Sequence, residues 1–110
     1  MADAVQALAE LRSFLQTTTE VEFLADRQKQ SFVFHRLVIV GEAAVNLRPA
    51  YASLYADVPW PQLVGLRNRL VHAYFDLNLP MLWNLASTGS VKLEVQFARI
   101  LQTEFPGPHP

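Results

Sequence analysis

Apolar residues recur along most of the chain at the three-to-four-residue spacing of an amphipathic α-helix. This spacing predicts a first helix over about residues 3–16. Thr19 followed by Glu22 is a capping-box pattern and predicts a short second helix that carries Phe23 and Leu24. No segment has the two-residue alternation of a β-strand. The pattern therefore predicts an all-α bundle of four to five helices.

The third predicted helix covers Arg27–Leu47, ends at Pro49 and is apolar on two faces. One stripe contains Phe34, Leu37, Val38, Gly41 and Val45, and the other contains Phe32, Ile39, Ala43 and Leu47. A helix that is apolar on two faces must bury both. In a chain of 110 residues, one face can meet the core and the other a second copy. Gly41, Ala43 and Ala44 would allow close helix approach, so we expect a homodimer.

The rest of the chain also has helical spacing. We expect a short connecting helix over about residues 50–57, a helix over about 61–75, another over about 79–86 capped by Asn78, and a last one over about 91–104, with the run Ser87–Ser90 breaking the chain between the last two. Residues 1–105 then form one domain, and the Pro-rich residues 106–110 form a disordered tail.

Composition narrows the possible functions. The chain has no cysteine, which excludes a disulfide scaffold, thiolate zinc and a cysteine nucleophile. Its net charge of −1 argues against a broad DNA-coating surface but leaves room for a focused phosphate site. No signal peptide and no apolar run of about 20 residues is present, so we expect a cytoplasmic protein that does not enter a membrane.

The chemistry-bearing residues gather in the helix predicted over about residues 61–75. Eight consecutive positions hold Arg67, Asn68, Arg69, His72 and Tyr74. Asn68 and His72 lie one turn apart on one face. Arg67 is about 140° from His72 around the helix, but its long side chain can bend toward that face. A twofold axis beside this helix would bring two copies of each group to one cleft.

Two such copies carry what metal-free cleavage of RNA requires. One histidine can take the proton from a 2′-hydroxyl, and a second can protonate the leaving 5′-oxygen. Arginine and asparagine can stabilise the charge that develops on the phosphate. The pattern therefore points to a phosphodiester-cleaving site.

Five sequence elements resemble the HEPN superfamily, and within it the HepT-like toxins of MNT–HEPN toxin–antitoxin systems. They are Glu22-Phe23-Leu24-Ala25-Asp26, Val40-Gly41-Glu42-Ala43-Ala44, Val58-Pro59-Trp60, Gly65-Leu66-Arg67-Asn68, and His72 with Tyr74 two positions later. They occur in the same order and spacing as in the family, and the resemblance covers about residues 5–103.

This resemblance implies an all-helical HEPN-like homodimer that acts as a metal-independent endoribonuclease toxin of a type VII-like system. By position, Arg67, Asn68 and His72 match the family's catalytic residues. Tyr74 matches the tyrosine that a cognate nucleotidyltransferase antitoxin modifies with AMP. The chain would need no cofactor of its own, because ATP and Mg²⁺ would belong to the antitoxin. The RNA substrate would be tRNA or mRNA.

Three further residues have supporting roles in this interpretation. Glu42 lies in an apolar helix and is expected to pair with a cleft arginine or with the partner chain. Arg69 faces away from Asn68 and His72 and is expected to contact solvent or RNA. Asp76, one turn after His72, can orient the imidazole or simply end the helix. His72 and Asp76 lack a third ligand, so we expect no metal site.

A second hypothesis is a HEPN-like dimer without nuclease activity that serves as a nucleotide-binding or scaffold subunit. The presence of Arg67, Asn68 and His72 favours the nuclease, whereas the net negative charge favours the scaffold.

Overall fold

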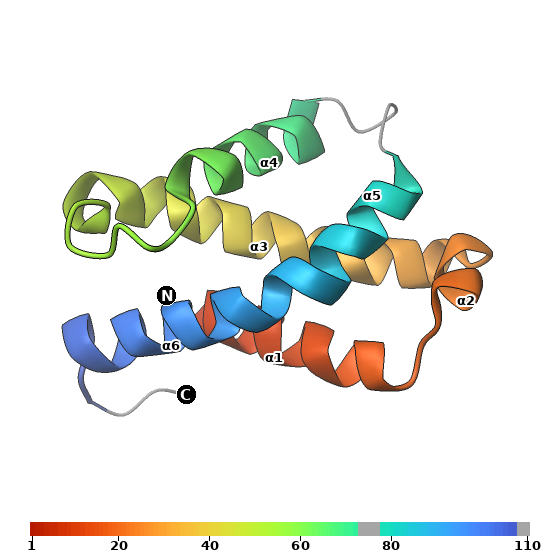
Figure 1. The fold of residues 1–110 in the computed structure, drawn as a ribbon, viewed down its shortest axis with the longest axis horizontal. Helices are drawn as coiled ribbons and strands as arrows, with labels where there is room; N and C mark the ends of the chain where they lie inside the picture. The colour runs from red at the N-terminus through yellow and green to blue at the C-terminus, as the bar shows by residue number, and fades with distance from the viewer. Residues whose placement is uncertain (73–77, 108–110) are drawn as a thin grey trace.

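The computed structural model describes residues 1–72 and 78–107, and every regular element in these two ranges is helical (Figure 1). The elements are α1 (Ala2–Gln16), α2 (Glu20–Leu24), α3 (Arg27–Tyr51), α4 (Trp60–His72), α5 (Leu79–Asn84), a π-helical segment (Leu85–Gly89) and α6 (Ser90–Glu104). The last three run on without an interruption and form one bent rod. The prediction of an all-α bundle is therefore confirmed.

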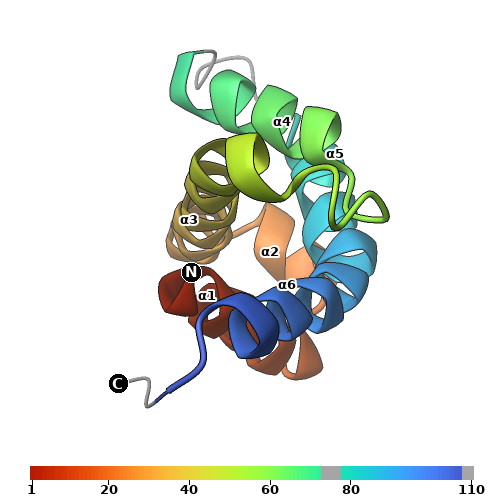
Figure 2. The ribbon, with the colours of Figure 1, turned by 90° about the vertical axis from the view of Figure 1, so that its left-hand side faces the viewer.

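The long helix α3 is the centre of the bundle. It packs against α1 on one side and α4 on the other, and α6 packs against α1. Figure 2 shows this order, with α4 and α1 on opposite sides of α3. The core between these helices is built from fully buried side chains such as Leu8, Leu11, Val33, Phe97 and Ile100. The pair α3–α4 lies at one side of the bundle, which leaves one side of α4 open.

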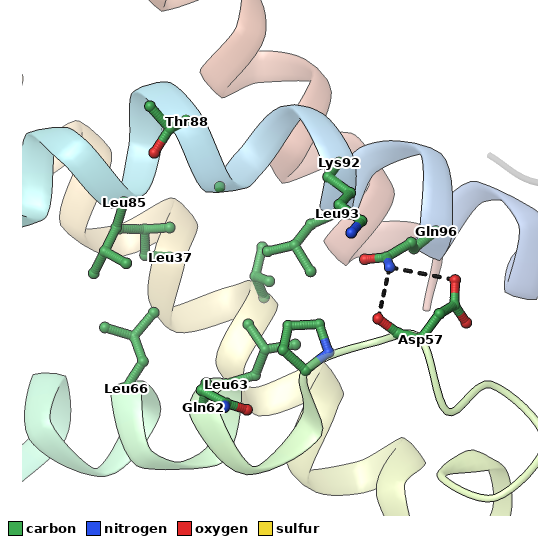
Figure 3. Close-up of a pocket in the computed structure, with 13 residues that line it drawn as sticks. Leu37, Asp57, Gln62, Leu63, Leu66, Leu85, Thr88, Lys92, Leu93 and Gln96 are labelled. Carbon is green, nitrogen blue, oxygen red and sulfur yellow. Dashed lines mark hydrogen bonds between the residues drawn. The ribbon is translucent and has the colours of Figure 1, made fainter.

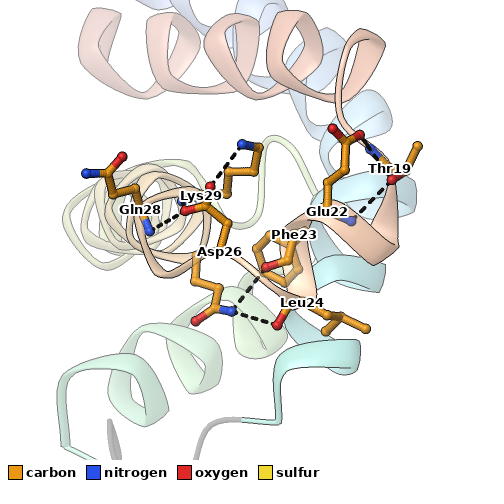
Figure 4. Close-up of polar contacts among 8 residues, drawn as sticks. Thr19, Glu22, Phe23, Leu24, Asp26, Gln28 and Lys29 are labelled. Atoms are coloured by element: carbon orange, nitrogen blue, oxygen red, sulfur yellow. Dashed lines mark hydrogen bonds and ion pairs between the residues drawn. The ribbon is translucent and has the colours of Figure 1, made fainter.

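Side-chain caps fix where the helices begin, as the sequence predicts (Figure 4). The Thr19 hydroxyl accepts a hydrogen bond from the Glu22 amide at 3.2 Å, and the Thr19 amide donates to Glu22 Oε1 at 2.9 Å. Asp26 starts α3 by accepting from the amides of Gln28 and Lys29 at 2.8 and 3.2 Å. These caps satisfy amides that have no partner inside the helix.

Protonation of the caps should destabilise the fold. The side-chain hydrogen bond from Lys29, with the backbone bonds, holds the pKa of Asp26 below its ordinary value. The backbone hydrogen bond from Thr19 does the same for the pKa of Glu22. A carboxylate with a lowered pKa in the folded state stabilises the fold above its unfolded pKa, and this contribution is lost as the pH falls.

Thermal unfolding measured from pH 6 downward should therefore show a midpoint that drops at and below the ordinary carboxylate pKa values of about 4. Asp26→Asn keeps a capping oxygen but removes the charge. Its midpoint should fall less steeply with acid than that of the wild type. Equal slopes for the two proteins would contradict this assignment.

Two predicted boundaries are wrong, and the first is at Pro49. Helix α3 continues through Pro49 to Tyr51, and a turn rather than a short helix follows. Proline removes one amide donor, but its fixed φ is compatible with a helix. Close to the end of α3 the backbone bonds continue past it, because the Ala52 amide donates to the Arg48 carbonyl at 3.1 Å. The missing bond and the crowding of the carbonyl one turn earlier are therefore tolerated in the folded chain without ending α3.

The second error is the predicted break at residues 87–90. This run stays helical because its hydroxyls bond to carbonyls of the preceding turn instead of capping a new helix. The hydroxyls of Ser87 and Thr88 donate to the Asn84 carbonyl at 3.4 and 2.6 Å. The Ser90 hydroxyl donates to the Ala86 carbonyl. The backbone here takes the wider π-helical form, which joins α5 to α6.

The expected surplus of apolar surface on α3 is largely covered within one chain. Leu37 and Gly41 of one stripe and Leu47 of the other are buried, and Phe32 and Ala43 pack partly against the core. Of the second stripe, Ile39 is the most open, at 38% exposed. Apolar excess alone therefore does not require a second copy, and the homodimer stays a prediction.

Candidate active site

Helices α3 and α4 are in close contact where Gly41 meets Arg67. A Cβ atom placed on Gly41 would lie 2.6 Å from the Arg67 Cβ and 3.2 Å from its Cα. Carbon atoms cannot approach to 2.6 Å without a shift of the backbone, so glycine is required for this packing. The predicted close approach at Gly41 is thus real, but its partner is α4 of the same chain rather than a second copy.

The Arg67 side chain is held at both ends of its guanidinium group. Its Nε donates to Glu42 Oε1 at 2.7 Å, and its Nη1 donates to Asn68 Oδ1 at 2.9 Å. The Arg67 side chain is 28% exposed and the Glu42 side chain 43%, so the pair lies at the surface of the α3–α4 contact. Two predictions are confirmed: Glu42 pairs with an arginine of the site, and Arg67 reaches Asn68.

Asn68 and His72 lie at the surface, one helical turn apart on α4. The oxygen of Asn68 is taken by Arg67, which leaves its amide hydrogens directed elsewhere. Within the described residues His72 makes no hydrogen bond or ion pair. Its imidazole is therefore available to a ligand at the exposed face of α4.

Arg69 points away from this group, as predicted. Its Nη1 lies 4.0 Å from the Sδ of Met81 on α5. The two arginines of the motif are thus separated: Arg67 faces Glu42, and Arg69 faces α5. Tyr74 and Asp76, the predicted AMP acceptor and supporting carboxylate, lie outside the described residues.

The positive charge of Arg67 is partly compensated at the site. Glu42 of α3 sits against Arg67 and offsets part of its charge, while one edge of the guanidinium group remains for another anion. In the two described ranges, no group of three or more His, Cys, Asp or Glu side chains could hold a metal ion. No described helix is long and apolar enough to span a membrane.

Glu42 should act by positioning Arg67. For the RNA cleavage that the sequence resemblance implies, we expect Glu42→Gln to lower the rate by about tenfold, because a neutral partner holds a guanidinium group less firmly than a carboxylate does. Loss of the whole guanidinium group in Arg67→Ala should cost more, about 10²–10³-fold. The control is Glu10→Gln, which alters the Glu10–Arg36 pair elsewhere on the protein.

Single-turnover cleavage rates of the two single variants and the double variant provide the test. If Glu42 acts by holding Arg67, Glu42→Gln should have no further effect in the Arg67→Ala background, where that contact is already lost. Multiplicative losses in the double variant would instead show that Glu42 acts independently of Arg67.

The fold and the site define an all-α protein that presents Arg, Asn and His on one exposed helix. The model of the family described as "Ribonuclease HepT-like" matches residues 4–100, nearly the whole chain. The protein therefore belongs to this family, which is part of the HEPN superfamily. The resemblance seen in the sequence is thereby confirmed.

Individual relatives carry the same kind of name. A protein of Thermococcus cleftensis named "Probable ribonuclease HepT" is 27% identical over 100 residues, covering 91% of each chain. A protein of Caldanaerobacter subterraneus subsp. tengcongensis that carries the name "Putative RNase" is 34% identical over 98 residues, covering 77% of this chain and 88% of its own. A Methanocaldococcus jannaschii protein that also carries the name "Putative RNase" is 32% identical over 83 residues, covering 76% of this chain and 69% of its own. No solved structure matches the chain.

Proposed function

We propose that this protein is the toxin of a toxin–antitoxin pair and acts as a metal-independent endoribonuclease. The observation that carries the proposal is the Glu42–Arg67–Asn68 hydrogen-bond chain beside an exposed His72. Membership of a ribonuclease family supports RNA as the substrate. Of the candidate RNAs, tRNA and mRNA are the ones that this family likeness favours.

In this mechanism the 2′-oxygen of one nucleotide attacks the adjacent phosphorus and the bond to the 5′-oxygen breaks. The proton of the 2′-hydroxyl passes to one neutral imidazole, and a protonated imidazole gives a proton to the leaving 5′-oxygen. The products are a 2′,3′-cyclic phosphate and a free 5′-hydroxyl. Arg67 and the Asn68 amide hydrogens stabilise the negative charge on the phosphate oxygens.

A homodimer supplies the second imidazole, since one chain offers a single histidine on α4. Apolar residues flank the site on both helices and support a twofold contact there. Val71, one turn after Arg67, is 45% exposed, and Ile39, one turn before Glu42, is 38% exposed. The proposed composite site therefore places His72 of each subunit in one cleft, in a particle of twice the chain mass.

The antitoxin in this proposal is a nucleotidyltransferase that transfers AMP from ATP to the Tyr74 hydroxyl. Tyr74 follows Arg67 by seven residues in the sequence, a spacing that returns to the same stripe of a regular helix, although Tyr74 itself lies outside the described residues. An added nucleotide would place an anionic phosphate and a bulky base where RNA binds. ATP and Mg²⁺ belong to the antitoxin, and the pair would act in the cytoplasm.

Cleavage of total cellular RNA by the purified protein in excess EDTA tests the proposal. We expect cleavage with 2′,3′-cyclic phosphate ends, and light scattering should give twice the chain mass. Cleavage that the chelator blocks would contradict the metal-free mechanism. A folded dimer with unmodified Tyr74 that does not cleave RNA would instead favour the second hypothesis, a nucleotide-binding or scaffold subunit.

A further inference from the structure

A cavity of about 320 Å³ lies between α4 and the rod formed by α5, the π-helical segment and α6 (Figure 3). Its walls are mainly apolar and come from four elements: Leu37 of α3, Leu63 and Leu66 of α4, Leu85 of the π-helical segment and Leu93 of α6. Cavities that bind small molecules have this size and this mainly apolar lining. Neither Arg67 nor His72 lines it, so it is separate from the proposed nuclease site.

One wall of the cavity holds a buried hydrogen-bond acceptor that no donor satisfies. Gln96 is 4% exposed, and its Nε2 donates to the Asp57 carbonyl at 2.9 Å and to Asp57 Oδ2 at 3.3 Å. These two acceptors fix the orientation of the amide, because a flipped amide would set oxygen against oxygen. The Gln96 Oε1 is then buried and has no hydrogen-bond partner among the described residues. Folded proteins rarely leave such an acceptor empty.

The backbone at the cavity is also unusual. Leu85 and Thr88 line the cavity from the π-helical segment. The π-helical conformation is rare in proteins as a whole, and where it occurs it is often found at functional sites. The Thr88 hydroxyl donates to the Asn84 carbonyl at 2.6 Å, which helps to hold this wider turn in place. The segment therefore belongs to the wall of the cavity and does not merely connect two helices.

The rim of the cavity carries an uncompensated positive charge. Asp57 is neutralised by Arg99, whose Nη2 lies 3.0 and 2.9 Å from the two carboxylate oxygens. Lys92 is exposed at the rim and forms no ion pair with any described residue. An anionic group on a bound molecule would therefore find its partner at Lys92.

We propose that this cavity binds a small amphipathic acid. Its apolar body fills the space among the leucines, one N–H or O–H group donates to Gln96 Oε1, and its carboxylate pairs with Lys92. This oxygen is buried in the structure, so a ligand in the cavity reaches it after a side chain of the cavity wall shifts. Figure 3 shows Lys92 and Gln96 on the same helix, α6, where both line the cavity.

Two matched probes test the proposal, indole-3-acetate and its isostere indene-3-acetate, which lacks the N–H donor. Calorimetry on the wild-type protein should show about fivefold tighter binding of the indole compound, the effect of one net hydrogen bond. In Gln96→Met this preference should disappear. The control Gln102→Met, at an exposed position of the same helix, should keep it. Indole without a carboxylate should bind more weakly, and Lys92→Gln should remove that difference.

Amide chemical shifts measured with the indole probe should change around Leu85–Gly89 and Gln96. Equal affinity of the wild type for the two acids, no binding at millimolar concentration, or shifts confined to other regions would each overturn the proposal. If Gln96→Met does not fold, the comparison of the two probes on the wild-type protein decides the question without it. RNA cleavage is not read out, so failure of the nuclease proposal and failure of this one are distinguishable.

Discussion

Replacement of His72 by alanine is expected to lower the rate of RNA cleavage by about 10²–10⁴-fold, the usual contribution of a positioned proton-transfer group. His72 is the last described residue of α4. Its side chain is exposed and forms no hydrogen bond or ion pair with any described residue. Exposed substitutions of this kind usually change the free energy of unfolding by at most about 0.5 kcal/mol. The variant should therefore keep its fold and its mass in solution while it loses activity.

The matched control is His109→Ala, which makes the same chemical change in the C-terminal tail and should leave the cleavage rate unchanged. Rates should be measured under single-turnover conditions with one RNA, together with the helical circular dichroism signal and the melting midpoint. A His72→Ala variant that cleaves at the wild-type rate would remove the imidazole from the mechanism. A variant that fails to fold would move the test to His72→Gln, which keeps a polar side chain of similar size.

Local signals explain which parts of the fold could be predicted. The capping box at Thr19 and Glu22 and the cap at Asn78 depend on residues within one turn, and both are as predicted. The helix end predicted at Pro49 is wrong, because the presence of a proline does not show whether the backbone bonds continue beyond it. The break predicted at residues 87–90 is wrong, because a serine or threonine hydroxyl can either cap a new helix or donate to a carbonyl of its own helix. Sequence alone does not show which of the two occurs.

In the candidate site, too, some features could be predicted from the sequence and others could not. Glu42 was correctly predicted to pair with an arginine, because a carboxylate in an apolar helix needs a partner. The small size of Gly41 signalled a close contact, yet nothing local to it identified α4 rather than a second copy as the partner. The cavity at Gln96 had no sequence signal, because its walls come from segments far apart in the chain. The catalytic roles of Arg67, Asn68 and His72 remain predictions. So do the roles of Tyr74 and Asp76, which lie outside the described residues.

Gly41→Ala is expected to be the most damaging small substitution near the site. The new methyl group would meet the Cβ and Cα of Arg67, which are rigid parts of α4 and cannot rotate away. Helices α3 and α4 must then separate, and the guanidinium group moves relative to Glu42 and Asn68. A displacement of about 1 Å in a catalytic group can cost about 10²-fold in rate. We therefore expect a loss of both cleavage and stability.

Gly65→Ala is the matched control, since it makes the same change on α4 where a Cβ meets nothing within 4 Å. Both variants gain roughly 0.5–1 kcal/mol because alanine suits a helix better than glycine does. The difference between them therefore isolates the cost of overpacking at Gly41, about 1–3 kcal/mol. Chemical denaturation should place Gly65→Ala at or above the wild type and Gly41→Ala below Gly65→Ala by this amount. Equal stability and equal cleavage rates in the two variants would show that the Gly41–Arg67 contact does not set the position of the arginine.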